Sequence, residues 1–182
     1  MELKYRFEEK QIGAIATKAY AGRPQTVFEM FHKTVETYPN REAVKYGNVC
    51  LTYSDLNQRV DELGAALQNN YHVRKGDRVA IFLKNDDTFP TAFLAVSKLG
   101  AVSVVLNTRM MKPELAYQLE ITKPVTAIVD GETWDKGLDD LVNFKMESTS
   151  LSQLWGTGGA CKPAVDGEDD LHPDFGLDRP PI

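Results

Sequence analysis

Two polar residues, Asn107 and Arg109, follow directly after the apolar stretch Ala101–Leu106. The stretch predicts a buried strand, and open α/β sheets usually bind ligands at the edge where their strands end. Asn107 and Arg109 are therefore our candidate cofactor-binding residues. Anchoring a polar loop is the commoner role for such a pair, and both roles stay open.

A pair of carboxylates, Asp86 and Asp87, superficially resembles a metal site. Because the pair follows Asn85 and precedes an apolar helical pattern, capping that helix is the better explanation. The remaining candidate ligands are scattered, and no two share metal-ligand spacing: Cys50, Cys161, His32, His72 and His172. We therefore predict no metal site and no disulfide framework in this chain.

The 182 residues are 42% apolar, enough for the core of one domain. No run of 18 apolar residues is present, and the charged start, MELKYRFEEKQ, is not followed by the apolar region of a secretory signal. We expect a cytoplasmic protein without a transmembrane segment, and leave association with a membrane surface open.

The net charge of −5 is concentrated at the C-terminal end, where residues 156–182 carry −4 together with five glycines and four prolines. Such a composition buries too little apolar surface to offset its ordering entropy. The chain lacks a basic patch, which argues against a nucleic-acid partner. We divide the chain into a polar leading arm (1–25), an α/β domain (26–142) and an irregular tail (143–182), with one more short helix expected at 134–141.

Three apolar strands are predicted at 78–83, 101–106 and 125–129, with a helical pattern in each gap. Strands without alternation are typical of parallel sheets that are covered on both faces. The sequence therefore predicts a three-layer α/β fold with a mostly parallel sheet and flanking helices. In the last helix of this unit Leu115, Leu119 and Ile121 are expected to face inward.

The residues before this unit predict a helix between Thr26 and Pro39, then a β-hairpin of Glu42–Tyr46 and Val49–Thr52 around Gly47-Asn48. A helix starting at Thr52 or Ser54 follows. Its apolar face is predicted to hold Leu56, Val60, Leu63 and Leu67, and its solvent side Asp55, Gln58, Arg59 and Asp61.

Five short motifs occur in order along the chain: Leu51–Leu56 (LTYSDL), Val73–Ile81 (VRKGDRVAI), Lys98–Val102 (KLGAV), Leu106–Arg109 (LNTR) and Lys112–Tyr117 (KPELAY). Together they resemble the N-terminal portion of the adenylate-forming (AMP-binding) superfamily over roughly residues 26–130. The LNTR motif is similar to the LNPR of acyl-CoA synthetases and fatty-acid CoA ligases.

The resemblance implies a two-step reaction. A carboxylic acid attacks the α-phosphate of ATP, with Mg²⁺ present, to give an acyl-adenylate, and the thiol of coenzyme A then takes the acyl group. In such a protein Met110 and Met111 could line the acyl pocket, although methionines beside a helix start more often fill gaps in a core.

The family's phosphate-binding loop has the form SGTTGxPKG. The closest string here, Gly156–Pro163 (GTGGACKP), has the Lys–Pro order reversed, lacks the run of hydroxyls and is followed by acids. We interpret it as tail, with a degenerate phosphate loop as the alternative. The family's later adenine, ribose and catalytic-lysine motifs are not found, so we predict no catalytic residue in this chain.

Our leading hypothesis is a truncated or fragmentary acyl-CoA synthetase-like ligase that is inactive alone and needs no cofactor by itself, whereas the intact family uses ATP, Mg²⁺ and coenzyme A. The alternative is a non-catalytic α/β interaction module or weak nucleotide-binding module. An exposed apolar edge would then favour self-association or a partner chain. A third explanation is that residues beyond 130 are not family sequence, because of an early stop, a frameshift or a gene-model error.

Overall fold

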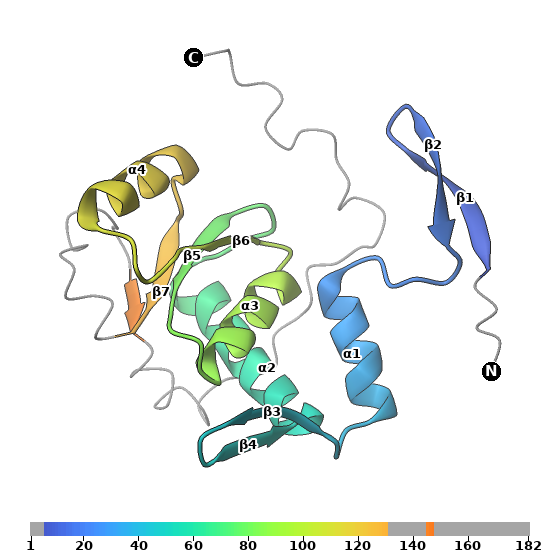
Figure 1. Ribbon diagram of the computed structural model, residues 1–182, viewed down its shortest axis with the longest axis horizontal. Helices are drawn as coiled ribbons and strands as arrows, with labels where there is room; N and C mark the ends of the chain where they lie inside the picture. Colours follow the sequence, from blue (N-terminus) through green and yellow to red (C-terminus); the bar gives the residue numbers. More distant parts are fainter. Residues whose placement is uncertain (1–5, 131–144, 148–182) are drawn as a thin grey trace.

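The computed structural model of the chain describes residues 6–130 and 145–147 (Figure 1). At its centre lies a four-stranded sheet in the order β6-β5-β7-β8, in which every neighbouring pair is parallel. The strands are β5 (Arg78–Phe82), β6 (Val102–Val105), β7 (Thr126–Val129) and β8 (Lys145–Glu147). The predicted parallel sheet is confirmed.

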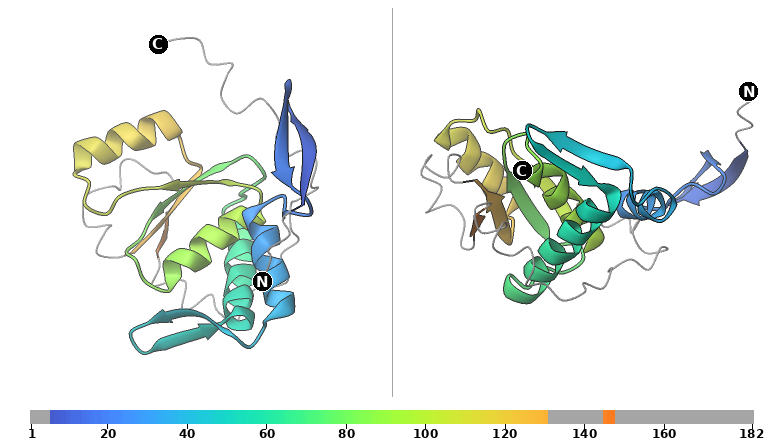
Figure 2. Two further views of the ribbon diagram at one scale, coloured as in Figure 1. Left: turned by 45° about the vertical axis from the view of Figure 1, so that its right-hand side comes forward. Right: turned by 90° about the horizontal axis from the view of Figure 1, so that it is seen from below.

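The sheet is covered on both faces, because successive residues of β5 point to opposite sides. Val79 and Ile81 belong to a core shared with the first three helices, whereas Ala80 and Phe82 pack with the fourth. The helices are α1 (Val27–Thr37), α2 (Tyr53–Asn70), α3 (Thr88–Lys98) and α4 (Lys112–Thr122). The three-layer α/β fold is therefore confirmed (Figure 2).

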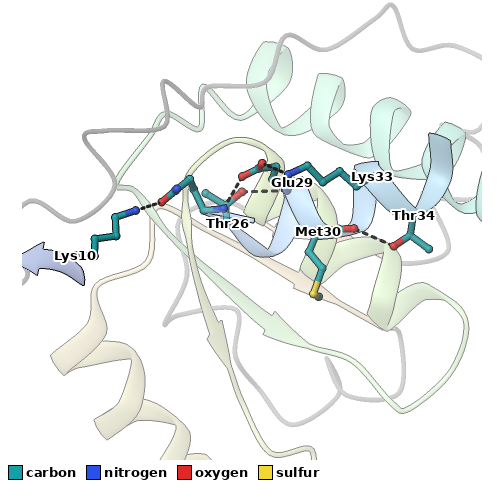
Figure 3. A network of polar contacts seen from close by, with 7 residues as sticks. Lys10, Thr26, Glu29, Met30, Lys33 and Thr34 are labelled. Atoms are coloured by element: carbon teal, nitrogen blue, oxygen red, sulfur yellow. Dashed lines mark hydrogen bonds and ion pairs between the residues drawn. The ribbon is translucent and has the colours of Figure 1, made fainter. Parts of the chain in front are cut away.

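The helix starts follow the sequence signals. Thr26 caps α1 by accepting a hydrogen bond from the backbone N–H of Glu29, 3.0 Å away, within the polar network of Figure 3. Between the first two helices the predicted hairpin is confirmed as β3 (Glu42–Tyr46) and β4 (Val49–Thr52).

The return from α3 to β6 depends on Gly100, whose φ of +63° is a left-handed conformation that favours glycine. The carbonyl of Gly100 accepts a hydrogen bond from the N–H of Gly76, and the N–H of Val102 donates to the carbonyl of Asp77. The KGD and LGA motifs thus meet at one end of the sheet, where a Cβ on Gly100 would lie 3.1 Å from the Lys75 side chain.

The leading arm contains structure that the sequence analysis did not predict. β1 (Phe7–Ile12) and β2 (Ile15–Tyr20) form an antiparallel hairpin around Gly13 and stand apart from the sheet (Figure 1). The alternation of apolar and polar residues is weak here because the FEEKQI segment places charges on both faces of the strand.

Two further expectations need correction. Ile121 is 40% exposed, because α4 turns only Leu115 and Leu119 toward the sheet. Residues 145–147, assigned to an irregular tail, form β8 and extend the sheet beside β7. The helix expected at 134–141 and the rest of the tail lie outside the described residues.

The supposed solvent side of α2 in fact holds two ion pairs with the α3 segment. Arg59 Nη1 lies 2.8 Å from Asp87 Oδ2, and Asp61 Oδ1 lies 2.5 Å from the Nζ of Lys98. The Lys98 side chain is only 7% exposed and its Nζ also lies 5.3 Å from the centre of the Phe28 ring of α1. Lys98 therefore joins three helices, and the prediction that Arg59 and Asp61 merely face solvent is wrong.

Removing Asp61 should cost more stability than removing the charge of Lys98. Asp61→Ala leaves a buried ammonium without its carboxylate, so we expect the free energy of unfolding to fall by about 1–3 kcal/mol. Lys98→Met keeps the apolar stem and removes the buried charge, so we expect a change below about 1 kcal/mol. Urea denaturation measures both values, and equal losses would contradict this explanation.

The cap of α2 should make stability depend on pH. The hydroxyl of Thr52 and its N–H both donate to the Asp55 carboxylate, which holds the pKa of that carboxyl below its usual value. A lowered pKa stabilises the fold above the unfolded value of about 3.9, and this stability is lost as the pH falls through the folded pKa. Asp55→Asn should therefore lower the thermal midpoint of unfolding at pH 7 and have a smaller effect at pH 3. An equal drop of the midpoint at both pH values would contradict this role of the Asp55 carboxylate.

Candidate functional site

The chain leaves β5 toward α3 on one face of the sheet and leaves β6 toward α4 on the other face. Because these two connections diverge, a crevice opens between the carboxyl ends of β5 and β6, which is where open α/β sheets bind ligands. The structure has a hollow of about 510 Å³ at this place. Its walls are Leu83, Lys84, Asn85 and Phe89 on the β5 side and residues 105–109 on the β6 side.

Both residues proposed from the sequence, Asn107 and Arg109, line this hollow. Leu106 joins them to the sheet, because its N–H donates to the carbonyl of Ile81 over 2.9 Å. The Oδ1 of Asn107 then accepts the backbone N–H of Arg109 at 2.9 Å, and its carbonyl accepts the N–H of Met110 at 3.0 Å. Asn107 thus anchors the turn, as the commoner interpretation expected, and in doing so it positions Arg109.

The wall of the hollow carries positive charge from Lys84 and Arg109 and no carboxylate. Arg109 is exposed, and within the described part of the chain its guanidinium has no hydrogen-bond or ion-pair partner. Asp130 is not part of this lining, although its Oδ2 accepts the backbone N–H of Lys84 at 3.2 Å. This arrangement suits an anionic group better than a cation.

The aspartates at the start of α3 are engaged elsewhere and do not form a metal pair. Asp86 Oδ1 accepts the backbone N–H of Thr88, the first residue of α3, at 2.9 Å and also its hydroxyl, whereas the N-cap residue, Asp87, makes no side-chain cap bond. Asp87 instead pairs with Arg59. Among residues 6–130 and 145–147, no three histidine, cysteine or acidic side chains gather as metal ligands.

The other reactive side chains lie away from the hollow. Cys50 is an exposed free thiol whose Sγ donates to Glu42 Oε2 over 3.1 Å. This hydrogen bond to a carboxylate raises the pKa of the thiol, which disfavours the reactive thiolate. His32 and His72 are exposed, and Cys161 and His172 lie outside the described residues.

The two methionines have different surroundings. Met110 is partly buried and packs with the core beneath α4, as a gap-filler does, whereas Met111 is 68% exposed. Neither lines the hollow. The sequence analysis instead missed Lys84, Asn85 and Phe89, although the rule that singled out the end of β6 applies equally to the end of β5.

Solved structures with a similar fold include a fatty acyl CoA synthetase and the N-terminal domain of FACL13. The chain is 25% identical to a Mycobacterium tuberculosis fatty acyl CoA synthetase, with a TM-score of 0.70, over 78% of this chain and 30% of that one. It is also 25% identical to the N-terminal domain of FACL13 from the same organism, with a TM-score of 0.69, over 78% and 38% of the two chains. The fold is therefore that of the N-terminal domain of adenylate-forming enzymes.

A family model described as AMP-binding enzyme matches residues 31–169, and the chain belongs to this family. Curated relatives include a long-chain-fatty-acid–CoA ligase of Haemophilus influenzae, 32% identical over 58% of this chain and 19% of the relative. A 2-succinylbenzoate–CoA ligase of Geobacillus sp. is 38% identical over 54% of this chain and 20% of the relative. The chain thus spans about a fifth of the length of these relatives.

The family match continues to residue 169 and so includes the Gly156–Pro163 string, beyond the point near residue 130 where the sequence resemblance ended. Apolar periodicity fades in this region, so the sequence analysis had no helix or strand pattern to follow there. The conformation of that string lies outside the described residues. In the described part of the chain, no helix has the length and apolar character needed to cross a membrane.

Proposed function

We propose that this chain supplies the N-terminal α/β part of an ATP-dependent acid–thiol ligase, which activates a carboxylic acid as its adenylate and transfers it to coenzyme A. The observation that carries the proposal is the family match over residues 31–169. The names of the relatives support coenzyme A ligation, and one of them supports a fatty acid as the substrate class. The exposed free thiol of Cys50 fits a reducing compartment such as the cytoplasm.

Within this ligase we propose that the hollow between β5 and β6 takes an anionic group of a substrate. All three substrates are anions, since ATP and coenzyme A carry phosphates and the acid a carboxylate. Arg109 presents a guanidinium whose fork of N–H groups matches either group, and Lys84 adds a second charge on the opposite wall. The Asn107 turn fixes the backbone from which Arg109 extends.

The donors at this hollow do not fit the magnesium ion of the family. Mg²⁺ requires oxygen ligands, mainly carboxylates, phosphates and water, whereas the charged side chains here are cations. Magnesium would reach this place only on the phosphates of a nucleotide. The proposed role of these residues is therefore to bind and orient an anion.

The chain by itself should not catalyse adenylate formation. Stabilising the transferring phosphoryl group requires donors and a metal around the α-phosphate, and the described residues provide one cationic hollow. We expect no ATP–pyrophosphate exchange above background for the purified 182-residue chain with acetate, octanoate, palmitate or benzoate as the acid. Measurable exchange with any of these acids would overturn this prediction.

Anion binding should nevertheless be detectable and should depend on Arg109. Calorimetric titration with ATP, with coenzyme A and with octanoate identifies which substrate the hollow takes. Loss of a charge-assisted hydrogen bond predicts roughly tenfold weaker binding for Arg109→Gln. Arg74→Gln removes an exposed arginine at the opposite end of β5 and should leave binding unchanged. Equal affinities of the two variants would contradict the assignment of the hollow.

A further inference from the structure

The β1–β2 hairpin is a two-stranded sheet with both outer edges open among the described residues. It projects from the body of the molecule beyond the start of α1 in all three views (Figures 1 and 2). The side chain of Lys10 donates to Gln25 Oε1 over 2.7 Å, next to the cap of α1 (Figure 3). A two-stranded hairpin is at best marginally stable in water, so an additional strand would stabilise it.

The hairpin register shows which backbone groups are available. Arg6 lies opposite Ala21, and the N–H of Ala21 donates to the carbonyl of Arg6 over 2.9 Å, so this is a hydrogen-bonded pair. Hydrogen-bonded and non-hydrogen-bonded pairs alternate along an antiparallel ladder. The N–H and carbonyl groups of Phe7, Glu9 and Gln11 therefore point away from β2, along the free edge of β1.

The same hairpin exposes large apolar side chains. The rings of Phe7 and Tyr20 lie 4.9 Å apart and remain 60% and 53% exposed, and Ile15 at the turn is 71% exposed. An open edge beside exposed aromatic rings is a surface that pairs with another strand.

We propose that the edge of β1 pairs antiparallel with β1 of a second copy of this chain, giving a four-stranded sheet across a two-fold axis. An axis perpendicular to the sheet keeps each residue on its own face, so facing residues are both odd-numbered or both even-numbered. The residues whose backbone groups point outward from β1 then pair across the two copies, with Glu9 opposite Glu9 and Phe7 opposite Gln11. These pairs form about six backbone hydrogen bonds.

Charge complementarity selects this register. On the other face of the sheet it places Glu8 opposite Lys10 of the second copy, and it does so twice because of the symmetry. A shift by one pair would instead place Lys10 opposite Lys10 in one direction and Glu8 opposite Glu8 in the other, and both like-charge pairs are unfavourable. The central Glu9 pair is flanked on each side by Lys18, its partner within the hairpin.

The edge of β2 lacks this complementarity. Pairing β2 with itself in the corresponding way would set Lys18 opposite Lys18, flanked by Glu9 just as the Glu9 pair is flanked by Lys18. It would add no pair of opposite charges, because Lys18 is the only charged residue of β2. Lys10 has three N–H donors, so its bond to Gln25 leaves it able to meet Glu8 of the second copy. The self-complementary edge is therefore that of β1.

Sedimentation equilibrium of the full chain tests the proposal. The mass should rise with concentration from 20.3 kDa toward twice that value. Glu8→Lys and Lys10→Glu each place like charges opposite one another and should each weaken the dimer roughly tenfold. The variant with both changes restores opposite charges and should recover dimerisation. Within the hairpin these two residues face Ala19 and Thr17, so the exchange leaves its own charge pair intact.

A matched pair of proline variants tests which edge is used. Glu9→Pro removes an outward N–H from β1, and Lys18→Pro removes the directly opposite one from β2. Only Glu9→Pro should abolish the dimer. Three outcomes would overturn the proposal. The chain could remain monomeric at all concentrations, the dimer could be insensitive to the charge changes, or the two proline variants could have equal effects. None of these outcomes depends on whether the hollow binds an anion.

Discussion

The burial of β5 on both faces is the constraint on which the rest of the structure depends. Residues Val79–Phe82 are fully buried, so helices must cover both sides of the sheet. The chain meets this demand by crossing to β6 over one face and to β7 over the other. The divergence of these two connections opens the hollow at the strand ends. The site is thus a geometric consequence of how the core is covered.

The polar contacts around this core serve two different purposes. On the helical side, the pairs Arg59–Asp87 and Asp61–Lys98 fix α2 against the α3 segment and neutralise charges that the packing brings together. At the strand ends, Asp87 pairs with Arg59 and Asp86 binds Thr88, and neither carboxylate lines the hollow. The charged side chains that line the hollow are those of Lys84 and Arg109. The same interactions that stabilise the helices therefore determine the charge of the site.

Apolar patterns were sufficient to predict the sheet and its flanking helices, and the two-residue turn at Gly47-Asn48 was sufficient to predict the β3–β4 hairpin. The predictions failed where the polarity pattern of the sequence does not match the surroundings of the residues in the fold. Arg59 and Asp61 occupy polar positions of α2, yet each meets a partner some 28 to 37 residues along the chain. The FEEKQI strand of the arm carries charges on both faces because no core covers either of them. The periodicity of apolar residues in a sequence reflects burial, so it cannot predict strands that remain exposed.

By itself the sequence determined membership of the fold class, since the order of its apolar strands, capping residues and glycines specifies each element locally. It also placed Asn107 and Arg109 at a strand end, because that position follows from the order of elements alone. Only the tertiary structure decided which other residues share the site. Lys84 and Phe89 share the hollow with Arg109 because β5 and β6 are parallel neighbours, and the nearby Asp87 pairs with Arg59, which is distant in sequence. Contacts of this kind depend on how separate elements pack, and no local pattern encodes them.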